Sequence, residues 1–186
     1  MNKLKEILLV VLSLGLATAS ASAESAKGSE EQPLRVMLIP ADGGTEDGTI
    51  ADFKPLFNSM TKSTGLHFDL KVGQSYAAVI AAMTNQQADI AWFGPVSYLA
   101  AKQRGGAELL ALSVVKGEST YFSGIFVARN SGIDTIADLV GKDVAFGDPN
   151  STSSFVYPMA MILKNGIDPV RDLNSIRLAG SHSNSL

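Results

Sequence analysis

The 186-residue chain contains no cysteine, one tryptophan and two histidines. The absence of cysteine excludes disulfide bonds, thiolate-ligated zinc, thioether-linked haem, a cysteine nucleophile and a lipid-modified amino-terminal cysteine. Two histidines without clustered carboxylates give no metal site. Lys and Arg number 15 against 18 Asp and Glu, so the basic surplus of a nucleic-acid-binding protein is missing. Hydrophobic residues make up 46% of the chain, which is enough for a folded core and excludes a disordered chain.

The first 23 residues have the pattern of an export signal. Two lysines precede an uncharged stretch over residues 7–23, whose first part is strongly apolar. The stretch ends in Ala21-Ser22-Ala23, the small-x-small pattern that a signal peptidase cleaves. The alternative is a membrane anchor, but the apolar part is too short for a spanning helix of about 20 residues. We therefore predict a cleaved signal peptide over residues 1–23 and a periplasmic location.

Apolar runs and helical patterns alternate along the rest of the chain, after a polar leader over residues 24–33 that we expect to be mobile. The alternation indicates the α/β class with largely parallel sheets. The patterns predict strands over residues 34–39, 66–72, 88–93, 109–115, 121–128, 144–146 and 176–178. They predict helices from about 50 to a cap at Gly65, with Pro55 in or near the first turn, and over 75–85, 95–104, 135–140 and from 151–154 to near 166.

Four loops follow predicted strands and open predicted helices, at residues 73–76, 94–95, 147–154 and 180–185. The carboxyl ends of parallel strands meet at one edge of a sheet, and ligands bind at that edge. The four loops are rich in hydroxyl groups and backbone donors and hold one histidine and almost no cations. A ligand site at this edge would therefore use neutral donors.

The loop over residues 147–154 carries four consecutive hydroxyl side chains, Ser151-Thr152-Ser153-Ser154, where a helix begins. The first N–H groups of a helix have no partner within it, and the helix dipole makes that end positive. Hydroxyl donors beside such an end suit a phosphoryl-type anion without Lys or Arg. The alternative is simple helix capping, for which one Ser or Thr suffices. A Walker loop is missing, which disfavours nucleotide hydrolysis.

Three further side chains at this edge are candidates for contacting an anion. His182 follows the last predicted strand, and its alternative roles are those of a surface residue or of a histidine whose hydrogen bonds are satisfied within the protein. Tyr76 and Tyr121 flank the same edge, and either could instead be a core residue. A hydrolase triad of a loop serine, His182 and Asp148 is the enzymatic alternative, but the Gly-x-Ser-x-Gly elbow is missing. We therefore expect ligand binding rather than catalysis, with no cofactor and no metal.

Four segments resemble, in family order, the phosphate/phosphite/phosphonate-binding proteins of bacterial ABC transporters. They are residues 74–80, 88–95, 147–154 and 180–182, and the Asp-Pro-x-Ser-Thr-Ser run in the third is the most specific. The resemblance covers residues 34–186 and implies a type II periplasmic-binding-protein fold, in which two α/β lobes close on a ligand. It also implies a set of residues that hold the ligand oxygens: Tyr76, Tyr121, Ser151, Thr152, Ser153 and His182.

The resemblance implies the solute-binding component of an ABC importer for a phosphorus oxyanion, with phosphonate favoured over phosphite or phosphate. Its partners would be a membrane permease and an ATPase, and a periplasmic sensory module of the same fold is the alternative. The implied first lobe spans residues 34–118, a connecting strand spans 119–129 and the second lobe spans 130–186. The chain stops after a strand, a loop and a helix start, so we expect a truncated second lobe. The family's acidic specificity residues would then lie beyond Leu186.

Overall fold

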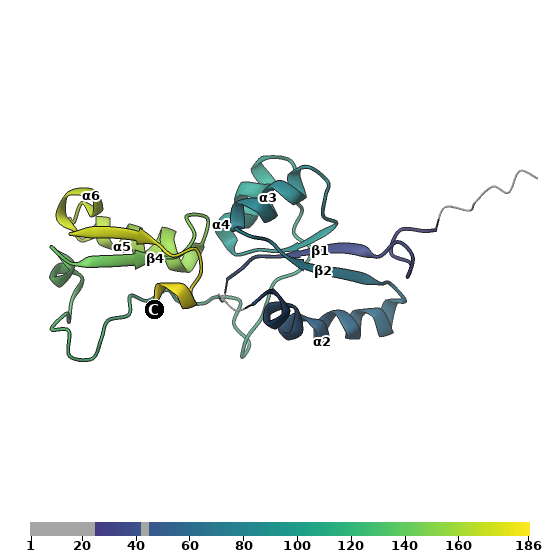
Figure 1. The fold of residues 1–186 in the computed structure, drawn as a ribbon, viewed down its shortest axis with the longest axis horizontal. Helices are drawn as coiled ribbons and strands as arrows, with labels where there is room; N and C mark the ends of the chain where they lie inside the picture. The colour runs from purple at the N-terminus through teal and green to yellow at the C-terminus, as the bar shows by residue number, and fades with distance from the viewer. Residues whose placement is uncertain (1–24, 42–44) are drawn as a thin grey trace, which may run out of the picture.

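The computed structural model describes residues 25–41 and 45–186, which form two lobes lying side by side (Figure 1). Each lobe is built on its own sheet, and all strand pairs in both sheets are parallel, which confirms the predicted α/β class. The predicted signal peptide lies outside the described residues. In the part of the chain that is described, no helix has both the length and the apolar character needed to cross a bilayer.

The first lobe contains a three-stranded sheet in the order β2-β1-β3. Helix α2 covers one face of the sheet, and helices α3 and α4 cover the other (Figure 1). The bounds are β1 Leu34–Leu38, α2 Glu46–Thr64, β2 Phe68–Val72, α3 Tyr76–Thr84, β3 Ile90–Trp92 and α4 Pro95–Gln103.

Strand β1 is apolar apart from Arg35 because side chains from both of its faces pack against helices. Successive side chains of a strand point to opposite faces, so Val36 and Leu38 pack with Phe57 of α2. Ile39, which directly follows the strand, packs with Tyr76 and Val79 of α3 on the opposite face. The central strand therefore fixes where the amino end of α3 lies.

Helix α2 begins four residues before the apolar spacing that predicted it. Thr45 is the N-cap, and its Oγ1 accepts a hydrogen bond from Gly48 N at 3.1 Å. Glu46 and Asp47 add negative charge at the positive end of the helix dipole. The prediction that Pro55 lies near the first turn is therefore wrong, because this residue is in the helix interior. The predicted cap at Gly65 is confirmed, with a φ of 74°.

Part of the polar leader, the turn around Gly28, packs against the first lobe, whereas residues 26, 27 and 30–32 are exposed. Gly28 N donates to Gln32 O at 2.7 Å, and Gly28 O accepts from His67 N at 2.8 Å. Gly28 is buried with a φ of 90°, and a Cβ there would meet Leu66 Cδ2 at 2.7 Å. Glycine therefore permits both the turn and the close approach.

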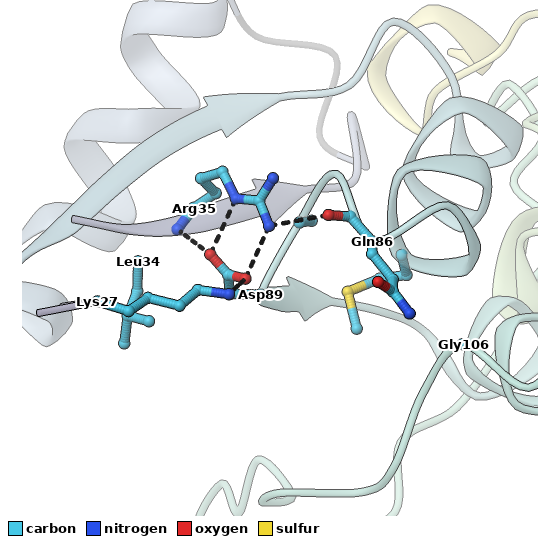
Figure 2. A pocket seen from close by; sticks show the side chains of 8 residues that line it. Lys27, Leu34, Arg35, Gln86, Asp89 and Gly106 are labelled. Atoms are coloured by element: carbon cyan, nitrogen blue, oxygen red, sulfur yellow. Dashed lines mark hydrogen bonds and ion pairs between the residues drawn. The ribbon is translucent and has the colours of Figure 1, made fainter. Parts of the chain in front are cut away.

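An ionic cluster joins this turn to the amino-terminal ends of β1 and β3 (Figure 2). Arg35 donates from Nη2 to Asp89 Oδ1 at 2.8 Å and from Nε to Oδ2 at 3.0 Å. Arg35 Nη2 also donates to Gln86 O at 2.9 Å, and Lys27 forms an ion pair with Asp89. The cluster lines an open depression of about 520 Å³. Because it lies at the amino-terminal ends of the strands, this depression is at the opposite edge from the hydroxyl-rich loops.

The cluster makes the stability of the first lobe depend on pH. The side-chain hydrogen bond from Arg35 holds the pKa of Asp89 well below its usual value of 3.8. A carboxylate with a lowered folded-state pKa stabilises the fold above its unfolded pKa, and this contribution is lost as the pH falls below about 4. We expect Asp89→Asn to unfold more readily at pH 7 and to lose less further stability on acidification than the parent.

Urea unfolding of the first lobe between pH 7 and pH 3 measures this difference. The exposed Asp52→Asn is a matched control, because it removes the same charge from the surface of α2. Parallel acid profiles of the parent and Asp89→Asn would show that the ionic cluster contributes nothing.

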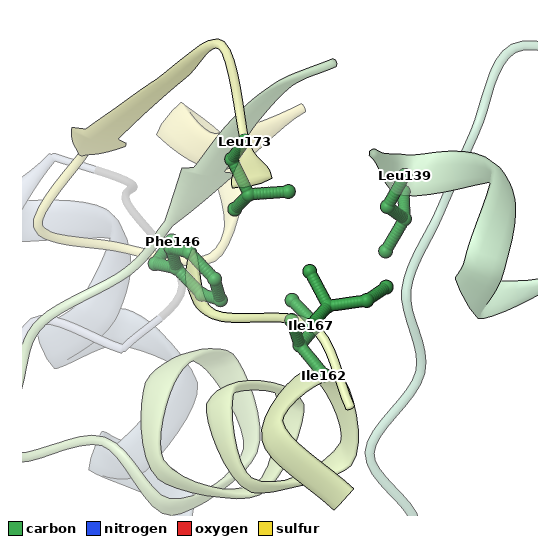
Figure 3. Packing of buried hydrophobic residues seen from close by; sticks show 5 residues of the cluster. All are labelled: Leu139, Phe146, Ile162, Ile167 and Leu173. Atoms are coloured by element: carbon green, nitrogen blue, oxygen red, sulfur yellow. The ribbon is translucent and has the colours of Figure 1, made fainter. Parts of the chain in front are cut away.

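The second lobe contains a two-stranded sheet and a small apolar core. The core consists of Leu139, Phe146, Ile162, Ile167 and Leu173, which point toward one another between the strands and the helices (Figure 3). All four residues of β5 (Ser175–Leu178), at one edge of this sheet, are exposed. The bounds are η1 Ile136–Leu139, β4 Asp143–Phe146, η2 Thr152–Val156, α5 Tyr157–Lys164, α6 Pro169–Asp172, β5 Ser175–Leu178 and η3 Ser183–Ser185.

The strands predicted over residues 109–115 and 121–128, the latter within the connecting strand 119–129, are absent from the structure. A strand forms when a neighbouring strand satisfies its backbone groups. Among the described residues, this part of the chain makes one isolated bridge, between Val115 and Glu118. Most of its apolar side chains are accordingly exposed, with Phe122 at 95%, whereas Ile125 packs against the core of the second lobe. The prediction that these segments form strands is therefore wrong, although both segments are rich in apolar residues.

Candidate ligand-binding site

The loop that follows β4 is held rigid by its own side chains. Asp148 Oδ1 accepts hydrogen bonds from Asn150 N at 2.8 Å and from Asn150 Nδ2 at 3.1 Å. Ser151 is the N-cap of η2, and its Oγ accepts from Ser154 N at 3.2 Å. The predicted helix start within residues 151–154 is confirmed, and the loop geometry fixes the first hydroxyl groups of that helix.

The first turn of this helix is a π-turn, and Pro158 follows it directly. Val156 N donates to Ser151 O at 3.0 Å, one residue further back than in an α-helix. Pro158 has no N–H, so the carbonyl of Ser154 cannot receive its usual helical hydrogen bond. That carbonyl accepts from Gly147 N at 3.0 Å instead, which ties the loop back onto the helix. A Cβ at position 147 would collide with the Ser154 side chain, so only glycine allows this approach.

The amino ends of three helices converge where the two lobes meet. Tyr76 N, at the start of α3, donates to Asp148 Oδ2 at 3.2 Å. Val96 N, at the start of α4, donates to Thr152 Oγ1 at 2.9 Å. Because Thr152 itself opens the helix formed by η2 and α5, three positive helix ends face this junction.

The junction is buried and polar. Tyr76 and Ser151 are each 2% exposed and Thr152 is 7% exposed. Of the buried polar residues in the described part of the chain, Asp148 is the only one with a carboxyl group. Thr152 Oγ1 accepts from Val96 N and can still donate its own hydrogen, because a hydroxyl group does both. Asp148 already compensates the positive end of α3, so the junction offers an anion the hydroxyl donors and the positive ends of α4 and of the helix formed by η2 and α5.

The structure brings four of the six predicted site residues to this junction or directly beside it. Tyr76, Ser151 and Thr152 lie within it, although the Tyr76 ring also belongs to the core of the first lobe. Ser153 is half-buried, and its carbonyl accepts from Ser123 Oγ of the connecting segment at 2.6 Å. Their contact with a ligand stays a prediction.

The other two predicted residues are placed differently. His182 is half-buried, and its backbone N donates across the lobes to Ala41 O at 2.8 Å. Tyr121 is 56% exposed on the unpaired connecting segment. The described structure therefore does not bury Tyr121 together with the hydroxyl residues.

Two features of the junction were not predicted from the sequence. Asp148 was expected only as a member of a hydrolase triad, whereas its carboxylate accepts hydrogen bonds from Tyr76 N and Asn150. The loop at residues 94–95 was expected at this edge, but Val96 N was not predicted as a donor toward Thr152. The Asp-Pro-Asn sequence signals an Asx turn, but no local pattern shows which carboxylate reaches the other lobe.

Comparisons with known proteins agree with this architecture. A family model described as "ABC transporter, phosphonate, periplasmic substrate-binding protein" matches residues 44–186. The phosphate-import protein PhnD of Mycolicibacterium smegmatis is 31% identical over 140 residues, covering 73% of this chain and 43% of that protein. The phosphonates-binding periplasmic protein of Escherichia coli is 28% identical over 162 residues, covering 84% of this chain and 47% of that protein.

Solved structures give the same fold. The binding protein component of an ABC phosphonate transporter from Pseudomonas aeruginosa matches with a TM-score of 0.70 and 27% identity, covering 79% of this chain and 50% of that one. PhnD1 of Prochlorococcus marinus, solved with methylphosphonate, matches with a TM-score of 0.60 and 18% identity, covering 82% of this chain and 57% of that one. At that identity the second match shows the fold alone.

The chain belongs to the family of periplasmic substrate-binding proteins of phosphonate ABC transporters. The family and the periplasmic-binding-protein fold expected from the sequence are thereby confirmed. The chain spans about half the length of the curated relatives it matches, at 43% and 47% of their lengths.

Proposed function

We propose that this protein binds a phosphorus oxyanion, with phosphonate preferred, as the solute-binding component of an ABC importer. The observation that carries the proposal is the junction at which the amino ends of three helices meet, with the buried hydroxyl groups of Ser151 and Thr152 at one of them. The names of two relatives, a phosphate-import protein and a phosphonates-binding protein, support a ligand with a phosphoryl or phosphonyl group.

The mechanism is binding without a chemical step. A doubly or singly charged oxyanion loses its hydration on entering a closed junction, and preoriented N–H and O–H donors offset that cost. Hydroxyl groups from the second lobe and helix ends from the first lobe contact the same ligand, so binding favours the closed arrangement of the lobes. A closed shape is what a permease and its ATPase would recognise, and these two components are the proposed partners.

Titration calorimetry of the chain with methylphosphonate, 2-aminoethylphosphonate, inorganic phosphate and sulfate tests the proposal. We expect saturable binding of at least one phosphonate, weaker binding of phosphate and the weakest response to sulfate. A folded chain, verified by circular dichroism, that binds none of the phosphorus oxyanions would contradict the proposal.

We also propose that the protein is exported and cleaved after Ala23. The support is the charged start, the apolar stretch and the small-x-small pattern of the first 23 residues, together with a relative named as periplasmic. Mass spectrometry of the exported protein should find Glu24 at its amino terminus, and a mature protein that starts at Met1 would contradict cleavage.

A further inference from the structure

The Asp148 carboxylate lies between the lobes, although the binding of an anion gives it no role. The residue is 6% exposed, and a buried carboxylate requires hydrogen-bond donors. Its Oδ1 accepts hydrogen bonds from Asn150 N and Nδ2 of its own loop. Its Oδ2 accepts a hydrogen bond from Tyr76 N of the opposite lobe at 3.2 Å. One of the hydrogen bonds to this carboxylate therefore exists only while the two lobes are in contact.

The position of Asp148 also suits the charge distribution of the first lobe. Ser75, the N-cap of α3, has its Oγ occupied by Ala78 N, so it does not serve Tyr76 N. The Asp148 carboxylate fills that place from the second lobe and adds a full negative charge at the positive end of α3. It acts as a helix cap supplied by the other lobe.

Helix α4 is also capped by a side chain of the second lobe. The N-cap of α4 is Gly94, which makes no side-chain capping bond. Thr152 Oγ1 of the second lobe accepts from Val96 N in its place. Both helices of the first lobe that start at the junction are thus capped by side chains of the second lobe. Separation of the lobes removes both caps at once.

We propose that Asp148 is an interlobe latch, a positioning residue that biases the lobes toward the closed arrangement by capping the first turn of α3. The proposal does not rest on the identity of the ligand, because the contact forms within the chain itself. Its consequence is that part of the population is closed before a ligand arrives. The apparent affinity of a ligand that binds the closed form is then higher, because less free energy is needed to close the lobes.

Single-molecule energy transfer on the chain without ligand tests the latch. The chain has no native cysteine, so Lys62→Cys on α2 and Lys164→Cys on α5 place one exposed dye on each lobe. We expect Asp148→Asn to lower the ratio of closed to open molecules by roughly 10-fold, the effect of losing one charge-assisted hydrogen bond. A carboxamide has a single acceptor oxygen, so it cannot serve both Asn150 N and Tyr76 N.

Two control variants separate the latch from the stability of its loop. Asp143→Asn removes a carboxylate that accepts hydrogen bonds from Asn174 and Ser175, both within the second lobe, so we expect it to leave the closed fraction unchanged. Asn150→Ala removes a partner of Asp148 within the loop and keeps the contact with Tyr76 N. If Asn150→Ala opens the lobes as much as Asp148→Asn, loop rigidity is responsible and the latch is wrong.

Amide hydrogen exchange at Tyr76 provides the second measurement. The latch predicts slow exchange of Tyr76 N in the parent and faster exchange in Asp148→Asn, with the second lobe still protected. An unchanged closed fraction in both Asp148→Asn and Asp148→Ala overturns the proposal. If both variants unfold the second lobe, the test is the exchange of Tyr76 N in the parent protein. Exchange at the rate of an unprotected amide overturns the latch, and slowed exchange supports it.

Discussion

Replacing Ser151 and Thr152 together by alanine is expected to weaken phosphonate binding by a few kcal/mol. Each hydroxyl lost to a charged ligand is worth about 1.5–3 kcal/mol, so the pair should lower affinity by at least 100-fold. Both side chains are buried at the junction, where little water competes for the anion. The change also removes the acceptor for Val96 N, which adds to the loss by weakening the contact between the lobes. Titration calorimetry measures the affinity.

The chain offers a matched control for this double variant. Ser63 and Thr64 are also a consecutive serine and threonine, and both hydroxyl groups donate to Met60 O at the end of α2. Their replacement by alanine removes the same atoms from a helix end far from the loops at the carboxyl ends of the strands. We expect unchanged affinity there. Equal affinity of the parent and the Ser151/Thr152 variant, with both folded, would mean that these residues only cap the helix.

The first lobe could be predicted from the sequence because its elements follow local rules. The three strands, the caps at Ser75 and Gly65 and the start of α4 at Pro95 agree with the structure. Period-two alternation identifies a half-buried strand such as β2, a nearly continuous apolar run identifies a strand covered on both faces such as β1, and helical spacing identifies the helices. The start of α2 was not predicted because the capping bond of Thr45 sets it at Glu46, four residues before the first apolar position, Ile50.

The connecting segment could not be predicted because a strand depends on a partner. Residues 121–128 are as apolar as β1, yet the described chain provides no neighbouring strand for them. Local sequence reports the apolar character of a segment but not the presence of a backbone to pair with. The same limit applies to Tyr121, whose exposed position follows from the unpaired segment that carries it.

The candidate site shows the difference between local and long-range information. The four hydroxyl residues and the helix that they open follow from sequence alone, and the structure confirms that helix start. The contacts of Thr152 with Val96 and of Asp148 with Tyr76 join residues 56 and 72 positions apart. Such pairs depend on how the lobes meet, which no pattern within one loop contains.

Replacing Phe146 by alanine is expected to destabilise the second lobe by about 3–5 kcal/mol, the usual cost of deleting a buried aromatic side chain. Phe146 is 2% exposed, lies at the centre of the small core and packs edge-on against Phe155, with ring centroids 5.5 Å apart. A lobe built on a two-stranded sheet has little other apolar burial to replace that contact.

The effect should be local to the second lobe, because each lobe has its own core. Hydrogen exchange should therefore show lost protection across β4, β5 and α5 while β1 stays protected, and phosphonate binding should be abolished because Phe146 directly precedes the loop of residues 147–154. Phe57→Ala is the matched control, because Phe57 is 5% exposed in the core of the first lobe and its ring packs at a tilt against that of Phe68. This variant should lose protection in β1 and keep it in β4, β5 and α5. Equal loss of protection in both lobes by either variant would instead show that the lobes unfold as one cooperative unit, with the hydrogen bonds at the junction strong enough to couple them.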